Sequence, residues 1–289
     1  MSICVYLWTN QLPMPETPAK PPKKTPFSDI DLNRWRDYGD VLTDSLWFFS
    51  NRAKGEGHQL DYHGNFIPQL ATQLFTRYTR QDEIVLDLFL GAGTSALEAL
   101  NMDRRCVGVE LKAELVEYVA GKIPPSDLGS RVRLLQGNSV NPDIVSRLRE
   151  ELRALDSDFA QFLVLHPPYA DIIQFSDLPE DLSTLSSTET FLDSFEAVVR
   201  NGYELLAPGR FAALIIGDKY AKGELIPLGF LCMERMKRVG FKTKAIIVKD
   251  IQGNEKGKGR TANLWRYRAL AGGYYIFKHE YIIVMFKPQ

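Results

Sequence analysis

The sequence is poor in residues that bind metals or form covalent cross-links. Its 289 residues include only three cysteines and four histidines, and the cysteines, at Cys4, Cys106 and Cys232, lie far apart. An odd and scattered set of this kind predicts neither a disulfide framework nor a zinc site, and it is typical of a reducing compartment. We therefore expect a cytoplasmic protein without a metal centre.

Long apolar runs and an excess of charge of one sign are also missing. No stretch is long enough to cross a membrane, and the first residues lack the basic flank and the apolar core of a signal peptide. With 35 basic and 36 acidic residues the formal net charge is −1, so the molecule as a whole has no general attraction for polyanions. Any surface for nucleic acid must therefore be a local patch.

The composition and the length are those of a globular protein with one large domain or two small ones. Residues 1–28 are rich in proline and lysine, which predicts a poorly ordered N-terminal arm. Aromatic residues between 29 and 60 are expected to pack onto a domain, with Asp44 or Ser45 capping a short helix. We expect residues 29–289 to form this single domain.

From residue 66 onward, apolar segments alternate between the spacing of helices and that of strands. Helices are predicted at 66–79, 94–101, 113–120, 144–155, 191–206 and 228–239. Strands are predicted at 84–89, 105–111, 132–135, 162–165, 211–217 and 243–248, with a last strand or hairpin within 274–286. Alternating strands and helices predict a parallel α/β sheet, with ligands at the carboxyl ends of its strands.

A glycine-rich turn follows the first of these strands, with the sequence Asp87-Leu88-Phe89-Leu90-Gly91-Ala92-Gly93-Thr94. Glycines allow the backbone to turn tightly and to approach a ligand closely. The turn matches the dinucleotide pattern G-x-G-x-x-A, and Glu110 ends the next strand where a ribose-binding acid is expected, so a nicotinamide enzyme is one alternative. Asp87 argues against it, because its carboxylate would repel a pyrophosphate. S-adenosylmethionine has no phosphate, and its ammonium and sulfonium groups favour a nearby carboxylate.

The fourth strand ends in a second motif, Leu165-His166-Pro167-Pro168-Tyr169. The two prolines stop further ladder pairing and fix an extended exit from the sheet. Tyr169 is therefore expected just beyond the strand end, where ligands of such sheets bind. A Pro-Pro pair alone is common, and a lone histidine is more often a packing residue. The motif is stronger evidence for a ligand site here, because the glycine turn precedes it in the sequence.

Together these motifs resemble those of the DNA amino-methyltransferases, which modify N4 of cytosine or N6 of adenine. The cofactor signature of that family, Asp-Pro-Phe-x-Gly-x-Gly-Thr, is matched by residues 87–94, with Leu88 in place of proline. Its catalytic signature is Asp, Asn or Ser followed by Pro-Pro and an aromatic residue. Residues 166–169 match it, with His166 at the first position. The order of the two signatures is similar to the family's gamma arrangement, and the resemblance spans residues 60–289.

The resemblance implies a Rossmann-like class I methyltransferase fold, which is a seven-stranded, mostly parallel sheet with an antiparallel last strand and helices on both faces. It implies S-adenosylmethionine as the cofactor, with Glu110 accepting hydrogen bonds from the ribose hydroxyls. Asn138 offers a carbonyl oxygen where the family usually has an acid beside the adenine amine, although a plain strand-end turn is nearly as good an interpretation. The cofactor-binding residues implied are His63, Asn65, Phe66, Asp87, Phe89, Gly91, Gly93, Thr94, Glu110 and Asn138.

The implied catalytic residues are His166, Pro167, Pro168 and Tyr169. An exocyclic amine is a poor nucleophile, because its lone pair is delocalised into the base. A neutral His166 side chain and the Pro167 carbonyl can accept its two hydrogens, and Tyr169 offers a face for a flipped base. We expect direct methyl transfer, with positioning as the main catalytic effect. Carbon-5 cytosine methylation is excluded, since no cysteine follows a proline.

Two long connections, at 171–190 and 250–273, are expected to contact double-stranded DNA. The second combines basic and aromatic residues that suit phosphates and bases. Its predicted DNA-binding residues are Lys256, Lys258, Arg260, Trp265, Arg266 and Arg268. The alternatives are an RNA or protein-glutamine N-methyltransferase and a catalytically silent DNA-binding relative. The target base, the recognition sequence, a paired restriction endonuclease and the oligomeric state stay open.

Overall fold

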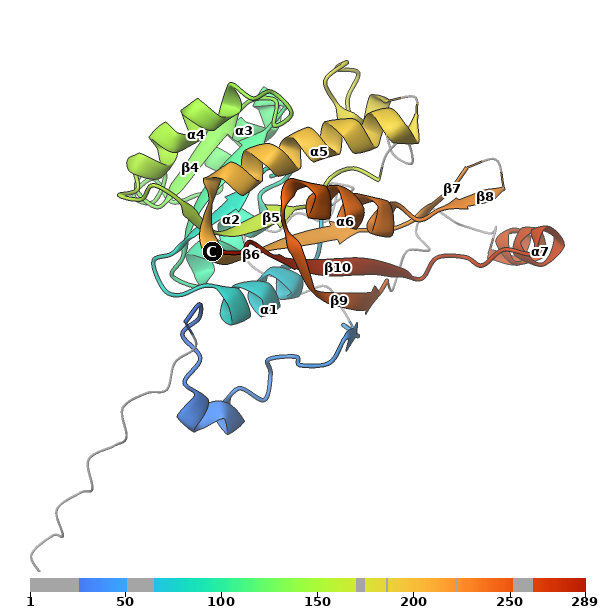
Figure 1. The fold of residues 1–289 in the computed structure, drawn as a ribbon, viewed down its shortest axis with the longest axis horizontal. Helices are drawn as coiled ribbons and strands as arrows, with labels where there is room; N and C mark the ends of the chain where they lie inside the picture. Colours follow the sequence, from blue (N-terminus) through green and yellow to red (C-terminus); the bar gives the residue numbers. More distant parts are fainter. Residues whose placement is uncertain (1–25, 51–64, 170–174, 186, 222, 252–261) are drawn as a thin grey trace, which may run out of the picture.

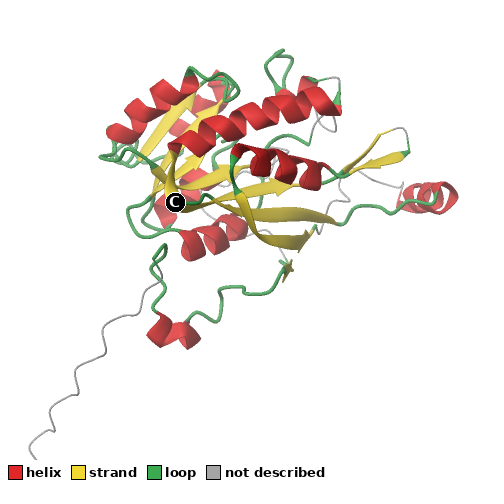
Figure 2. Ribbon diagram, in the orientation of Figure 1, coloured by secondary structure: helices red, strands yellow, loops and turns green. Residues whose placement is uncertain are grey.

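The computed structural model describes residues 26–50, 65–169, 175–185, 187–221, 223–251 and 262–289. In these ranges the chain forms three layers, with one large sheet between two sets of helices (Figure 1). Strands and helices alternate along most of the chain, as Figure 2 shows by colour. Among the described residues no helix has the length and apolarity needed to cross a membrane.

The large sheet has eight strands in the described part of the chain, in the order β1-β9-β10-β6-β5-β2-β3-β4. Neighbouring strands run parallel except β10, which runs antiparallel to both β6 and β9. The strands are β1 (Leu46–Trp47), β2 (Ile84–Asp87), β3 (Arg105–Glu110), β4 (Val132–Gln136), β5 (Ala160–Leu165), β6 (Leu206–Ile216), β9 (Lys242–Asp250) and β10 (His279–Phe286).

Helices cover both faces of this sheet, and each set closes one hydrophobic core. The first face is covered by α1 (Pro68–Tyr78), α2 (Thr94–Asn101) and α3 (Ala113–Ala120). The second face is covered by α4 (Ile144–Arg153), α5 (Thr188–Leu205) and α6 (Leu228–Val239). Short 3-10 helices, η1 (Leu32–Asp37) and η3 (Leu182–Thr184), lie in the connections.

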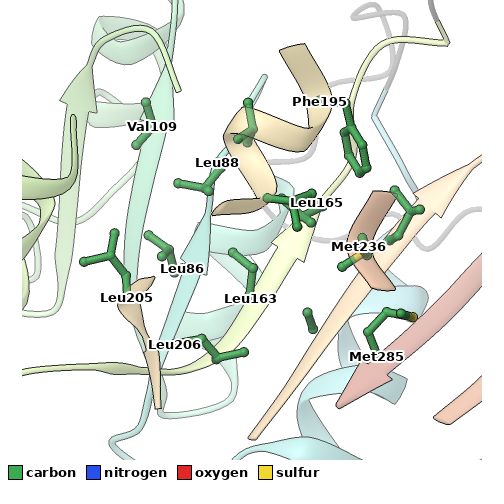
Figure 3. Close-up of a cluster of buried hydrophobic side chains, with 14 of the residues drawn as sticks. Leu86, Leu88, Val109, Leu163, Leu165, Phe195, Leu205, Leu206, Met236 and Met285 are labelled. Atoms are coloured by element: carbon green, nitrogen blue, oxygen red, sulfur yellow. The ribbon is translucent and has the colours of Figure 1, made fainter. Parts of the chain in front are cut away.

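The centre of the second core lies over β2 and β5, whose side chains are shielded from solvent on both faces of the sheet. Leucines such as Leu86 and Leu163 share this cluster with Phe195 of α5 and Met236 of α6, and Leu165 lies between the two groups (Figure 3). Strands buried on both faces have no polar side to expose, which is why their sequences are almost continuous apolar runs. The two strands that carry the glycine turn and the His-Pro-Pro-Tyr motif are thereby held rigidly.

The predicted helices and strands are confirmed, but the sheet has one strand more than the seven predicted. The extra strand is β1, which pairs in parallel with the end of β9 and buries Trp47. The predicted helix cap at Asp44 or Ser45 is wrong, because the Ser45 carbonyl accepts a hydrogen bond from Val248 N at 2.8 Å. This segment is too short for any periodic pattern to reveal a strand.

The predicted loop at 250–273 is also corrected, because it contains a helix, α7 (Ala262–Gly272), while residues 252–261 lie outside the described ranges. A separate hairpin of β7 (Lys219–Ala221) and β8 (Glu224–Ile226) projects from the same end of the molecule as α7 (Figure 1). The Tyr220 ring stacks on Phe277 at 4.9 Å and contacts Tyr274 at 5.2 Å. These rings tie the hairpin to the chain that follows α7.

Candidate active site

A cavity of about 1020 Å³ opens at the edge of the sheet where the parallel strands end. Its wall contains residues that directly follow β2, β3, β4, β5 and β6, together with the end of β9. Because β10 runs antiparallel, its first residues reach the same edge. The cavity is at the upper end of the ~300–1,000 Å³ range of small-molecule pockets, so it is large for a single small ligand.

The glycine turn between β2 and α2 forms one side of this cavity. Gly93 lies just before α2 with φ +83°, and a Cβ there would be 2.7 Å from Val119 Cγ1, so only glycine fits. The turn is closed by a hydrogen bond from Gly93 N to the Leu90 carbonyl at 3.0 Å. Of the residues predicted to bind the cofactor, Phe89, Gly91 and Thr94 line the cavity, whereas Gly93 does not.

Asp87 is buried beneath the turn instead of lining the cavity. Its carboxylate accepts hydrogen bonds from Phe89 N at 2.9 Å and from the Ser95 hydroxyl. Burial raises the pKa of this carboxyl to about 6. The expectation that Asp87 faces the positive groups of a cofactor is therefore corrected: the side chain braces the backbone of the glycine turn from below.

Glu110, which is predicted to bind the cofactor, lies at the end of β3 and lines the cavity. One carboxylate oxygen accepts from Gly91 N at 2.9 Å and the other from Lys112 N at 3.0 Å. Burial raises the pKa of this carboxyl. The Leu111 backbone also donates to this carboxylate, which has about four lone-pair sites in all, so one acceptor is left for a ligand hydroxyl. The wall beside Glu110 is apolar, with Val109 and Val140, which suits a flat ring such as adenine.

Asn138 follows β4 and also lines the cavity. Its side-chain carbonyl accepts a hydrogen bond from Val140 N at 2.9 Å, which closes a turn of its own. The oxygen predicted to receive an adenine amine is thus already bonded, with one lone pair left over. Both interpretations of this residue, a strand-end turn and a ligand contact, agree with its position.

The segment before α1 reaches the cavity from the other side. Of its predicted cofactor-binding residues, Asn65 and Phe66 line the cavity, and His63 lies outside the described residues. The Phe66 ring is almost completely buried and meets the His166 ring edge-on, with centroids 5.4 Å apart. This segment therefore joins the cofactor side of the cavity to the His-Pro-Pro-Tyr side.

The His166-Pro167-Pro168-Tyr169 motif leaves β5 at Leu165, and all four residues, which are predicted to be catalytic, line the cavity. The His166 ring lies between Phe66 and Tyr169, with a centroid distance of 5.9 Å to the latter. Loss of solvent lowers the pKa of His166 to about 4. The imidazole is therefore neutral near pH 7, and one of its nitrogens is a hydrogen-bond acceptor.

The Tyr169 side chain is held at two points. Its hydroxyl donates a hydrogen bond to Glu280 Oε2 at 2.8 Å, and burial raises the pKa of the phenol well above its ordinary value. A Cβ at Gly217, which follows β6, would lie 3.0 Å from Tyr169 Cε2. Glycine at this position thus lets the ring approach the backbone of β6, and the ring is fixed without any ligand.

Sequence reasoning missed several charged residues in the cavity wall, among them Lys249 of β9 and Glu280 of β10. They are direct neighbours across the two strands, and Lys249 Nζ lies 2.8 Å from Glu280 Oε1. Both side chains are buried, with 7% and 10% of their surface exposed. A charge at the start of an apolar strand is the signal that marks Glu280 in the sequence. Lys249 has no such signal, because β9 also carries Lys242, Lys244 and Asp250. Their pairing depends on the strand register, which the sequence does not display.

The predicted DNA-binding residues lie away from the cavity wall or outside the described ranges. Lys256, Lys258 and Arg260 fall within residues 252–261, and the side chain of Trp265 is likewise not described. Arg266 and Arg268 are exposed on α7. The same end of the molecule exposes the apolar side chains of Tyr267, Leu270 and Tyr275. The structure therefore brings the cofactor and catalytic motifs together, and leaves Arg266 and Arg268 on a projecting helix (Figure 1).

The strand order β4-β3-β2-β5-β6-β10-β9, the antiparallel β10 and the glycine turn after β2 define the Rossmann-like fold of S-adenosylmethionine-dependent methyltransferases. Residues 8–121 match the family model of the DNA methylases known as N6_N4_Mtase. The resemblance to this family is thereby confirmed over that part of the chain, which includes the glycine turn and Glu110. The fold and the family imply S-adenosylmethionine as the cofactor.

Comparison with solved structures finds many methyltransferases of low similarity. The chain is similar to TrmN from Thermus thermophilus (18% identity, TM-score 0.49), covering 78% of this chain and half of that one. It is similar to a methyltransferase from Pyrococcus furiosus (15%, TM-score 0.47; 79% and 88% covered). A candidate DNA modification methylase, also from Thermus thermophilus, matches at 22% identity and a TM-score of 0.30, with 45% of each chain covered. No curated protein sequence matches this chain.

Proposed function

We propose that this protein transfers a methyl group from S-adenosylmethionine to the exocyclic amine of a base in DNA, either N4 of cytosine or N6 of adenine. The observation that carries the proposal is the shared cavity. A glycine turn and Glu110 on one side meet a neutral His166 and a fixed Tyr169 on the other. The match of residues 8–121 to the DNA methylases supports DNA as the substrate.

The residues on the cofactor side fit S-adenosylmethionine by their chemistry. Glu110 offers a free lone pair to a ribose hydroxyl, Val109 and Val140 offer an apolar wall to the adenine, and no phosphate-binding cation is needed. When bound, the cofactor supplies an electrophilic methyl group. The protein residues bind it through the glycine turn and hold it next to the His166 side of the cavity.

The residues on the base side act by positioning and by accepting hydrogen bonds. His166 and the Pro167 carbonyl accept the two hydrogens of the amine, which localises its lone pair on nitrogen, and Tyr169 stacks on the flipped base. The carbon–nitrogen bond forms as the carbon–sulfur bond breaks, and the amine then loses one proton. A histidine with a pKa of about 4 retains that proton poorly, so His166 serves as an acceptor and the proton passes to water.

The decisive experiment is methyl transfer from labelled cofactor to duplex DNA, RNA and protein in parallel. We expect label in DNA only, and digestion to nucleosides should give N4-methylcytosine or N6-methyladenine. Label in RNA or in a glutamine side chain would establish the alternative substrates. DNA binding without any transfer would establish the catalytically silent relative. His166→Ala should lose most of the transfer and keep cofactor binding.

We further propose that residues 29–289 act as one catalytic domain and that α7 contributes to the DNA surface through Arg266 and Arg268. Each phosphate contact adds about one unit to the slope of log affinity against log salt. Replacing both arginines by alanine should weaken duplex binding and reduce this slope by up to about two units. Arg149 and Arg153 on α4, across the molecule in Figure 1, provide the matched control pair. Equal slopes in the two double variants would place the DNA surface elsewhere.

A further inference from the structure

The pair of charges formed by Lys249 and Glu280 has no role in the function proposed so far. The two residues lie opposite each other in the register of β9 and β10, at the edge of the sheet that forms the cavity. A buried ion pair is weak evidence for stability, because well-packed apolar residues often replace it without loss. A buried pair that reaches into a ligand cavity therefore calls for an explanation in terms of the site.

Glu280 connects this pair to the His-Pro-Pro-Tyr motif. Its Oε1 pairs with Lys249 Nζ at 2.8 Å, and its Oε2 accepts the hydroxyl hydrogen of Tyr169 at 2.8 Å. We propose that Glu280 and Lys249 are positioning residues of the methyl-transfer site: Glu280 holds the Tyr169 ring by its hydroxyl, and Lys249 cancels the charge of Glu280 beside His166. This inference rests on the function proposed above.

The first part of the proposal follows from the two constraints on the Tyr169 ring. Gly217 permits close contact with one edge of the ring, and Glu280 fixes its hydroxyl. A ring held at both points keeps its orientation before any base arrives. A platform fixed in advance reduces the ordering that a flipped base must cause on binding.

The second part concerns the charges near His166. Glu280 alone would stabilise an imidazolium, and Lys249 alone would oppose it, so the pair leaves the burial of the ring as the dominant influence on the His166 pKa. The neighbouring rings of Phe66 and Tyr169 carry no charge. Asp218, Asp250 and His279 face the same cavity but are not among the groups that shift the His166 pKa.

The charge balance is tested without methyl transfer, by nuclear magnetic resonance titration of the His166 ring in the full-length protein. We expect Lys249→Met, which leaves Glu280 unpaired, to raise the His166 pKa by about one unit or more. The double variant Lys249→Met/Glu280→Leu removes both charges and should return the pKa to the wild-type value. Because it replaces the pair by apolar residues, it also shows whether folding survives. Equal His166 pKa values in all three proteins would overturn the charge-balancing role.

The anchoring of the ring is tested by the single-turnover rate on duplex DNA and by the fluorescence of 2-aminopurine at the target position. Tyr169→Phe and Glu280→Leu break the same hydrogen bond, so each should slow transfer by about tenfold, and combining them should add little. Tyr281→Phe is the matched control, since it removes a hydroxyl from the next residue of β10, and that hydroxyl contacts Asp218 and His279 instead of Glu280. A wild-type rate in Tyr169→Phe would refute the anchoring role. Absence of transfer by the wild-type protein would instead refute the proposed function, while the titration result would stand.

Discussion

The pH dependence of methyl transfer is the sharpest test of His166. Only the neutral imidazole accepts a hydrogen bond from the amine, so the rate should fall as pH falls through the pKa of His166. An unperturbed histidine titrates near pH ~6.5, and the sequence alone predicts an acid limb there. Burial lowers the pKa of His166 to about 4. The limb should therefore move down by more than two pH units.

The two pKa values give very different degrees of His166 protonation at an ordinary assay pH. At pH 6 a histidine with the usual pKa is roughly three quarters protonated, whereas one with a pKa near 4 is about 1% protonated. The single-turnover rate should thus stay level from pH 8 to pH 5 and halve near pH 4. The same shift lowers the free energy of unfolding by up to about 3 kcal/mol as pH falls from 6.5 to 4, because the unfolded chain binds the proton more readily.

His166→Asn separates this effect from acid unfolding. Asparagine keeps an acceptor that does not titrate, so the variant should retain part of the activity and lose the acid limb. Near-ultraviolet circular dichroism at each pH checks that the fold persists. An acid limb near pH 6.5 in the wild-type protein, absent from the variant, would mean that the His166 ring is well hydrated and that the burial argument is wrong.

Three further predictions concern the surroundings of the cavity. Gly217→Ala brings a Cβ within 3.0 Å of the Tyr169 ring. We expect strain of about 1–3 kcal/mol and a slower single-turnover rate, while the cofactor affinity measured by calorimetry stays the same. An unchanged rate would show that the ring is free to move. Glu110→Ala should weaken cofactor binding by about tenfold or more, because a charged acceptor is lost; equal affinities would remove Glu110 from the cofactor site. The pKa of Asp87 is raised to about 6, so the folded protein holds this proton more tightly than the unfolded chain. The stability of the wild-type protein relative to the Asp87→Asn variant should therefore fall as pH rises from about 4 to 6. A constant difference between their urea midpoints would contradict the burial of this carboxylate.

The elements with long apolar patterns could be predicted from the sequence, and short ones could not. Helices α2, α3 and α6 begin and end where the spacing of apolar residues places them. The two residues of β1 and the three-residue strands of β7 and β8 are too short to show a period. These residues form strands because they pair with other strands, as β1 pairs with β9. A local sequence pattern does not reveal a partner that is distant in sequence.

The candidate site shows the same division between local and distant information. The glycine turn and the His-Pro-Pro-Tyr motif are continuous in sequence, so their place at the strand ends could be predicted. The burial of Asp87 could not, because a residue at a strand end can face either the core or the cavity. The Tyr169–Glu280–Lys249 contacts join β5, β10 and β9, and they depend on a sheet register that only the fold supplies.

The place of β10 also has a consequence for how the chain is synthesised. The strands of the cofactor side are complete at residue 165, whereas β10, the last strand made, inserts between β6 and β9 near the middle of the sheet. At ribosomal speeds of ~5–20 residues per second, the two events are on the order of ten seconds apart. Once β9 is complete at residue 250, the facing edges of β6 and β9 have no partner until β10 is made, which is a hazard for aggregation. The nascent chain thus completes its cofactor half first, and Glu280 arrives at the base half of the cavity only when β10 closes the gap.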